Sequence, residues 1–158
     1  IINNSVFYED LTDGDAYAIN KFKHIKSLID TENGYGENMF IYREMPPIND
    51  GTCIIHIPSD IKDKQDLINY IVKNLSFHFE EITSWDTLSY FISHMEWIKE
   101  KKVWINHDQL PSLQKNDLKQ YIKCLNDACE SLKYSNHQYE LTVYFPKNEE
   151  NATIRLLA

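Results

Sequence analysis

The residues with the clearest chemical potential lie in one segment, which begins at Glu80 and reads EEITSWDTLSYFISHMEWIKE. At about 100° per residue, a helix formed here gathers its apolar residues on one side. These core-facing residues are Trp85, Leu88, Phe91, Ile92 and Met95. The opposite side carries a row of Asp86, Tyr90, Ser93 and Trp97. Because a carboxylate beside large aromatic rings can hold a cation and offer contact area at small entropy loss, this row is a candidate protein-binding surface.

Acidic residues are concentrated around this row. Between Phe77 and Glu100 the sequence has five acidic residues against one base, Lys99. The acidic residues are Glu80, Glu81, Asp86, Glu96 and Glu100. The whole chain has 24 Asp and Glu against 16 Lys and Arg, a net charge of −8, which disfavours direct binding of nucleic acid. Net acidity alone can serve solubility, but its concentration here favours attraction of a basic protein partner.

A structural role for the two outer aromatic residues is the alternative. Tyr90 and Trp97 could pack beneath the N-terminal part of the chain, or the helix could end near Ser93 and turn Trp97 inward. Single exposed aromatic residues also need no functional explanation by themselves.

Enzyme, cofactor and metal chemistry find little support in the sequence. The six histidines form no HxH or HExxH motif, and none is paired with cysteine at zinc spacing. His78, beside Glu80 and Glu81, is the best acid–base candidate, although an exposed histidine near glutamate is common. Glycine motifs for phosphate and the GxSxG elbow are absent. We therefore expect no enzyme activity, no cofactor and no metal.

The cysteines and the hydropathy pattern indicate the cellular compartment of the protein. Cys53, Cys124 and Cys129 form no CxxC pair, which predicts reduced thiols in a cytosolic protein. Cys124 is expected on the polar flank of a helix and Cys129 on its apolar stripe, with inert thiols. The sequence has no run of eighteen apolar residues and its start lacks a signal-peptide pattern. We expect a cytoplasmic protein with no membrane partner.

The stretch REMPPINDGT, residues 43–52, divides the chain, because two prolines followed by Asn-Asp-Gly favour a turn or a short linker. Residues 1–50 are predicted to form an N-terminal β-α-β extension, with strands SVFYEDL and NMFIYREM around the helix DGDAYAINKFKHIKSLID. This extension would either join the main sheet or add a contact surface. Residues 51–158 are predicted to form the main domain.

Strands and helices alternate in the main domain. Strands are predicted in TCIIHIP, KKVWINH and YELTVYFP, with helices at residues 59–75, after Glu80 and at residues 112–134. Ser59, Asp60 or Asp63 could cap the first of these helices. The tail NATIRLL is predicted to pair back as a hairpin strand. Because strands separated by helices are usually parallel, the pattern predicts an α/β layered fold.

Roughly residues 52–145 resemble the barstar family of intracellular ribonuclease inhibitors. The resemblance lies in the order of the elements and in the run SWDTLSY, where Trp85, Asp86 and Leu88 fit the family's helix motif. Asp86 falls on an acid that family inhibitors use against the nuclease. In the run CLNDACE, Asp127 stands where the family has a contacting glutamate, with Glu130 close by. KKVWINH and YELTVYF resemble the middle and last strands of the family.

Three positions depart from the family motif. Ser84 replaces an asparagine, Ser89 replaces a frequent tryptophan and Tyr90 replaces a second aspartate. Without that aspartate and tryptophan, we expect poor inhibition of barnase itself and use of the same face against a different toxin.

The resemblance implies a barstar-like three-stranded parallel sheet with packed helices, plus the N-terminal β-α-β extension. It also implies an immunity protein that occludes the active site of a cognate basic toxin, with a ribonuclease as the expected kind, in a 1:1 heterodimer. The implied partner-binding residues are Glu80, Glu81, Asp86, Ser89, Tyr90, Ser93, Trp97, Asp127 and Glu130. The alternatives are a non-inhibitory interaction module, an immunity protein that binds its toxin away from the active site, and a small hydrolase.

Overall fold

A parallel sheet of four strands organises the computed structural model, which describes residues 38–48, 50–76, 81–135 and 138–158. The strands are β1 (Ile41–Tyr42), β2 (Thr52–Ile57), β3 (Lys102–His107) and β4 (Glu140–Phe145). Their order in the sheet is β1-β4-β3-β2, so β3 pairs with a strand on each side. The short strand β1 pairs with the end of β4.

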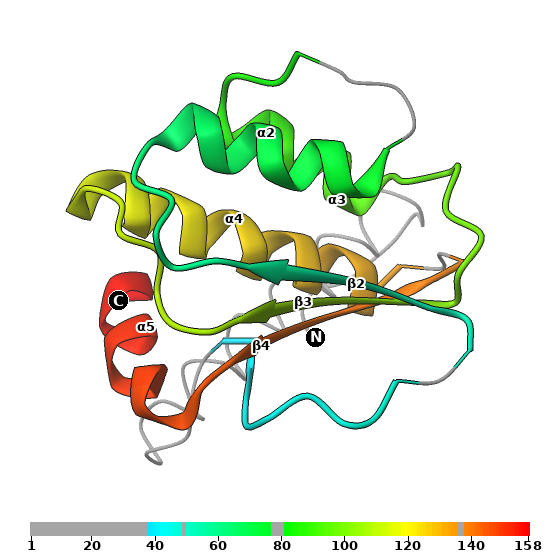
Figure 1. The fold of residues 1–158 in the computed structure, drawn as a ribbon. Coiled ribbons are helices and arrows are strands. Elements are labelled where there is room, and N and C mark those ends of the chain that lie inside the picture. Colours follow the sequence, from blue (N-terminus) through cyan, green and yellow to red (C-terminus); the bar gives the residue numbers. More distant parts are fainter. Residues whose placement is uncertain (1–37, 49, 77–80, 136–137) are drawn as a thin grey trace, which may run out of the picture. The chain divides into compact units, whose positions relative to one another are not determined.

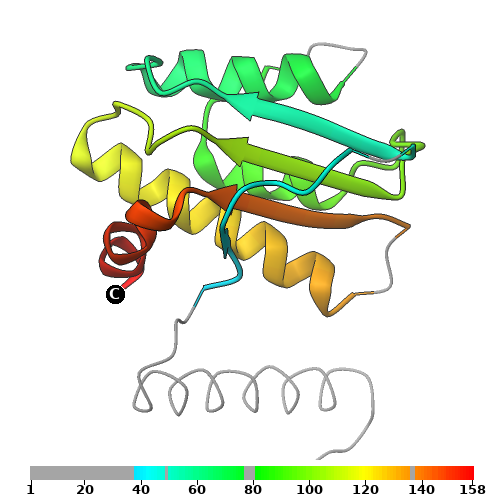
Figure 2. The same cartoon turned by 60° about the horizontal axis from the view of Figure 1, so that its bottom comes forward.

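Helices connect the strands and cover one face of the sheet (Figure 1). Between β2 and β3 lie α2 (Lys64–Leu75) and α3 (Trp85–Ser93), and between β3 and β4 lies α4 (Lys115–Lys133). After β4 come the 3-10 helix η1 (Lys147–Glu149) and α5 (Glu150–Leu157). Figure 2 shows the described residues between β1 and β2 running across the opposite face of the sheet. Because each helix connection joins parallel strands, α3 and α4 are brought to the same side.

The hydrophobic core lies between the sheet and the helices. Alternate strand residues face this core, as a period of two requires; they are Ile55, Ile57, Val103, Ile105, Val143 and Phe145, each at most 2% exposed. The fully buried helix residues packed in the same core include Leu67, Ile68, Ile71, Leu88, Ile92, Tyr121, Ile122 and Leu125. Burying each large apolar side chain stabilises the fold by about 1.5–3 kcal/mol. This core gives α3 and α4 a rigid support.

Local sequence fixes where two of the helices begin. The carboxylate of Asp63 accepts hydrogen bonds from the backbone N–H groups of Gln65 and Asp66 at 3.0 and 3.2 Å. The hydroxyl of Ser84 accepts one from the N–H of Thr87 at 3.1 Å. Each cap satisfies a backbone donor that the helix leaves unpaired, which is worth about 1 kcal/mol. Asp63 is thus the cap among the three residues that the sequence offered.

The predicted fold class is confirmed: three longer parallel strands carry packed helices on one face. The extension contributes β1, from the predicted strand NMFIYREM, as a fourth strand. The first strand and the helix predicted in this extension lie outside the described residues. Residues 38–158 form one compact unit, and the division of the chain at residue 50 stays a prediction.

The prediction for the tail is wrong, because NATIRLL belongs to helix α5 and not to a hairpin strand. Thr153 is fully buried, and its hydroxyl donates to the carbonyl of Glu150 and is hydrogen-bonded to the hydroxyl of Tyr42. Leu156 and Leu157 pack against the core from the same helix. Contacts with α4 and with β1, which are distant in sequence, therefore outweigh the local strand preference of this segment.

Candidate functional site

Helix α3 turns part of the predicted row outward. Trp85 and Leu88 are buried in the core, so the residues opposite them face away from it. Asp86 is exposed, and Tyr90 is 66% exposed. The predicted outward placement of these two residues is confirmed. They lie four residues apart on the helix, which makes them neighbours on its surface.

Helix α4 packs along α3 and brings further acidic residues to this surface. The hydroxyl of Ser89 on α3 donates to the carbonyl of Cys124 on α4 at 3.2 Å. Asp127 and Glu130, both exposed, follow Cys124 on the next turns of α4. We call the surface made by Asp86, Tyr90, Asp127 and Glu130 the acidic α3–α4 face.

Lys123 shows that these carboxylates share one electrostatic environment. Its ammonium lies 3.0 Å from the carboxylate of Asp127. The hydrogen bond to Asp127 and the charges of Asp127, Asp86 and Glu130 together raise the pKa of Lys123. Lys123 is a member of the site that the sequence analysis missed. Its spacing of four residues from Asp127 on one helix was the available signal.

His94 is the second residue that the sequence analysis missed. Its imidazole stacks on the ring of Tyr90, with centroids 4.0 Å apart and planes 19° apart. Its Nδ1 donates to the carbonyl of Tyr90 at 2.9 Å. The stack supports the tyrosine ring from one side, while most of that ring stays exposed.

Ser93 does not belong to the exposed row, and that prediction is wrong. Its side chain is 3% exposed, and its hydroxyl donates to the carbonyl of Ser89 at 2.8 Å. On a helical wheel, Ser89 and Ser93 lie on the flank of α3 that the Cys124 contact places against α4. Small side chains on this flank permit the close approach of the two helices.

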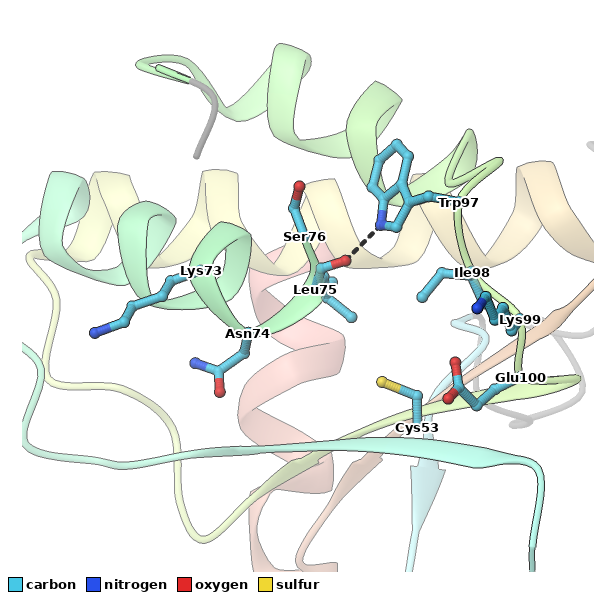
Figure 3. A pocket seen from close by; sticks show the side chains of 9 residues that line it. All are labelled: Cys53, Lys73, Asn74, Leu75, Ser76, Trp97, Ile98, Lys99 and Glu100. Carbon is cyan, nitrogen blue, oxygen red and sulfur yellow. Dashed lines mark hydrogen bonds between the residues drawn. The ribbon is translucent and has the colours of Figure 1, made fainter. Parts of the chain in front are cut away.

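Trp97 also departs from the predicted row, because α3 ends at Ser93. The indole N–H of Trp97 donates to the carbonyl of Leu75 at 2.6 Å, and its ring packs 5.1 Å from that of Phe91. Figure 3 shows Trp97 at the wall of a pocket of about 330 Å³, opposite Cys53 and Glu100. The alternative in which the helix ends near Ser93 and Trp97 turns inward is therefore the one that the structure shows.

The structure describes one of the two glutamates that precede α3. Glu81 is exposed in the non-helical segment that leads into α3. Glu80 lies outside the described residues. The structure thus brings together Asp86, Ser89, Tyr90, Asp127 and Glu130, and it leaves Ser93 and Trp97 in other surroundings.

Cys124 and Cys129 are buried on α4. Cys124 is buried, so its predicted place on the polar flank is wrong; the contact with Ser89 of α3 covers that part of α4. Burial, and then the charges of Asp127 and Asp86, raise the pKa of the Cys124 thiol well above its usual range. Burial and the charge of Glu130 raise the pKa of Cys129 to about 12. Both thiols therefore stay protonated at neutral pH.

His107 is buried and structural. Its Nδ1 donates to the carbonyl of Tyr144 at 3.0 Å, and its Nε2 accepts from the hydroxyl of Tyr121 at 2.6 Å. Burial lowers its pKa to about 3, so the imidazole is neutral. His78, the acid–base candidate from the sequence, lies outside the described residues. Within the described ranges, no three His, Cys, Asp or Glu side chains are grouped to hold a metal ion.

The described helices also bear on membrane association: none of them is long and apolar enough to cross a bilayer.

The fold and this surface define a class: a small α/β protein that presents carboxylates and a tyrosine from two packed helices. The model of the family Barstar (barnase inhibitor) matches residues 54–145, more than half of the chain. The chain belongs to the barstar family, as the resemblance in its sequence indicated. Members of this family are inhibitors that bind a ribonuclease and are not enzymes. Comparisons with curated proteins and with solved structures each returned no match.

Proposed function

We propose that this chain is an immunity protein that binds a cognate ribonuclease toxin in the cytoplasm and occludes its active site. The acidic α3–α4 face is the binding surface, and the complex is a 1:1 heterodimer. One observation carries the proposal: Asp86 and Tyr90 project outward from α3 beside Asp127 of α4, all within the region that the family model matches.

The chemistry of a ribonuclease makes such a surface effective. The active site of a nuclease must present cationic side chains to phosphate, so it has a positive potential. A surface with several carboxylates is complementary to that potential, which speeds encounter and fixes the orientation of the partners. An exposed tyrosine among the carboxylates adds apolar contact area at small loss of side-chain entropy.

Support from the core and from α4 matters as much as charge. Trp85 and Leu88 anchor α3 in the core, and Ser89 fastens it to α4. The carboxylates of the two helices therefore hold their spacing before the partner arrives. Such preorganisation favours tight binding, because little conformational freedom is lost in the complex.

Tyr90 sets this chain apart from the family motif, in which a second aspartate stands at its position. The face therefore carries one carboxylate fewer, and its aromatic ring stands at position 90 where the family motif frequently has a tryptophan at position 89. For this reason we propose a toxin other than barnase as the partner, with an active-site rim that accepts an aromatic ring.

The decisive experiment uses the toxin domain that this proposal predicts to be encoded beside the gene. We expect the purified chain to inhibit RNA cleavage by that domain at a 1:1 ratio. Truncation of a hot-spot residue at the centre of an interface weakens binding by about 2 kcal/mol or more, so Asp86→Ala with Tyr90→Ala should weaken inhibition by about 100-fold if these two residues are the hot spots of the face. The matched control is Asp60→Ala with Ile48→Ala, which removes a carboxylate and a large apolar side chain from exposed positions outside the face. Equal inhibition by both double variants would show that the assigned face is wrong.

The same assay separates occlusion from binding elsewhere. If the complex forms but still cleaves a dinucleotide substrate, the chain binds its toxin away from the active site. Competition between the chain and a substrate analogue for the toxin is the result that occlusion requires.

A further inference from the structure

We propose that the edge of β2 and the pocket beside it form a second interaction surface, which binds an extended segment of a protein partner. The segment adds to the sheet as an antiparallel strand and places an apolar side chain, flanked by acidic residues, in the pocket. This surface shares no residue with the acidic α3–α4 face, so the inference does not depend on the proposed ribonuclease partner.

Strand β2 lies at one edge of the sheet and, among the described strands, pairs with β3 alone. The carbonyl of Gly51 accepts from the N–H of Lys102 in β3 at 3.2 Å. Because the backbone groups of successive strand residues point to opposite sides, those of Thr52 and Ile54 point away from β3. Within the described residues, no group hydrogen-bonds to them. The edge therefore offers a donor and an acceptor at each of these two positions to an added strand.

The other end of this edge is closed by α2. The hydroxyl of Tyr70 donates to the carbonyl of His56 at 2.8 Å. This bond agrees with the direction assigned to Thr52 and Ile54, since His56 follows them at the same two-residue spacing. Tyr70 occupies the end of the edge at His56, so an added strand is confined to the half of β2 that begins at Thr52.

The pocket of about 330 Å³ adjoins this open half on the side of the helices (Figure 3). Cys53 of β2 and Leu75 of α2 line it together with Trp97 and Ile98. Cys53 is only half-buried, whereas Ile55 on the same face of β2 is 2% exposed. Every second side chain of an added strand also points toward the helices. The residue of the partner that lies opposite Cys53 therefore enters this mostly apolar pocket.

Two lysines give the pocket a charge opposite to that of the whole chain. Lys73 and Lys99, both exposed, line it together with one carboxylate, that of Glu100. Within the described ranges neither lysine forms a salt bridge. Residues two positions before and after the apolar residue of the partner point toward the helices as well. Acidic residues at these positions are complementary to the lysines, although the chain has a net charge of −8.

The first test uses the capped peptide Thr-Glu-Thr-Leu-Thr-Glu-Thr and a counterpart with lysine in place of both glutamates. Binding to the full chain is followed by NMR titration at about 0.15 M salt, where long-range attraction is largely screened. We expect the acidic peptide to bind about fivefold more tightly, the size of two exposed ion pairs. The net charge of −8 would by itself favour the basic peptide, so this preference must come from local lysines.

Two double variants locate the charge recognition. Lys73→Gln with Lys99→Gln should abolish the preference for the acidic peptide. Lys115→Gln with Lys119→Gln is the matched control, because it removes the same charge from exposed positions of α4 outside the pocket. This control should leave most of the preference in place.

N-Methylation of the peptide tests the strand pairing without altering the protein. In the antiparallel pair, the threonine before the leucine lies opposite Ile54 and exchanges two hydrogen bonds with it, whereas the leucine N–H points away from β2. N-Methylation of that threonine should weaken binding by about tenfold, the size expected for two hydrogen bonds. N-Methylation of the leucine, the matched control, should have little effect.

The outcomes are independent of the ribonuclease assay. Failure of both peptides to bind, equal affinity for the two, or a preference that survives the double variant at Lys73 and Lys99 would overturn this inference. Equal effects of the two N-methyl groups would overturn the pairing with β2. None of these results changes the expected inhibition of the toxin, and a failed inhibition assay would leave the peptide-binding surface standing.

Discussion

Two histidines of this protein make the same contact in opposite surroundings. His94 stacks on Tyr90 and His107 stacks on Phe145, each with ring centroids 4.0 Å apart. The first pair lies at an exposed rim of α3, and the second lies in the core beneath α4. The comparison teaches that residue type and contact geometry do not decide a role. Burial does, because it determines whether the ring is available to a partner or holds the fold together.

The largest effect is expected when the buried stack is removed. His107→Ala should lower the free energy of unfolding by about 3–5 kcal/mol, because it opens a cavity and leaves the Tyr121 hydroxyl and the Tyr144 carbonyl without partners. His94→Ala should change it by less than about 0.5 kcal/mol, as is usual at exposed sites. Urea unfolding of the two variants measures both values. A similar loss of unfolding free energy in the two variants would mean that the buried and the exposed stack contribute equally to stability.

The second effect is a dependence of stability on pH that the buried histidine produces. The pKa of His107 is lowered to about 3 in the folded protein from 6.5 in the unfolded chain. Because the unfolded state takes up a proton first, this contribution is complete above pH 6.5 and is lost as the pH falls toward 3. The slope is about 1.4 kcal/mol per pH unit in that window.

Comparison of His107→Phe with the parent chain isolates this contribution. The variant lacks the titrating group, so its stability should fall less between pH 6.5 and pH 4. Chemical denaturation at several pH values measures the difference. An unchanged slope in the variant would mean that other groups cause the acid sensitivity.

The smallest effect is expected at the exposed acidic face. Lys123→Met removes the ammonium that pairs with Asp127 and lies in the field of Asp86 and Glu130. Association with the basic toxin domain should become a few-fold faster, because the face becomes more negative. Lys115→Met changes the net charge equally at the far end of α4 and is the matched control. Stopped-flow mixing at low salt compares the rates; equal acceleration would indicate net charge alone.

Much of the fold could be predicted from the sequence, because periodicity along the chain fixes the elements. The apolar stripe of α4 and the runs TCIIHIP and KKVWINH each form the predicted helix or strands. The tail was predicted wrongly, since its helix depends on packing against α4 and on the buried hydroxyl of Thr153. No local pattern in NATIRLL reports those distant contacts.

The candidate site, like the fold, could be predicted from the sequence only in part. Helical spacing alone determined that Asp86 and Tyr90 face away from the core residues Trp85 and Leu88. Only the tertiary structure decided that α3 stops at Ser93, that the Ser93 side chain is buried, and that Trp97 turns toward the carbonyl of Leu75. It also placed Asp127 beside Asp86 through the contact between Ser89 and Cys124, 35 residues apart. The physical reason is that a sequence sets the direction of a side chain within its own helix, whereas exposure depends on what packs against that helix.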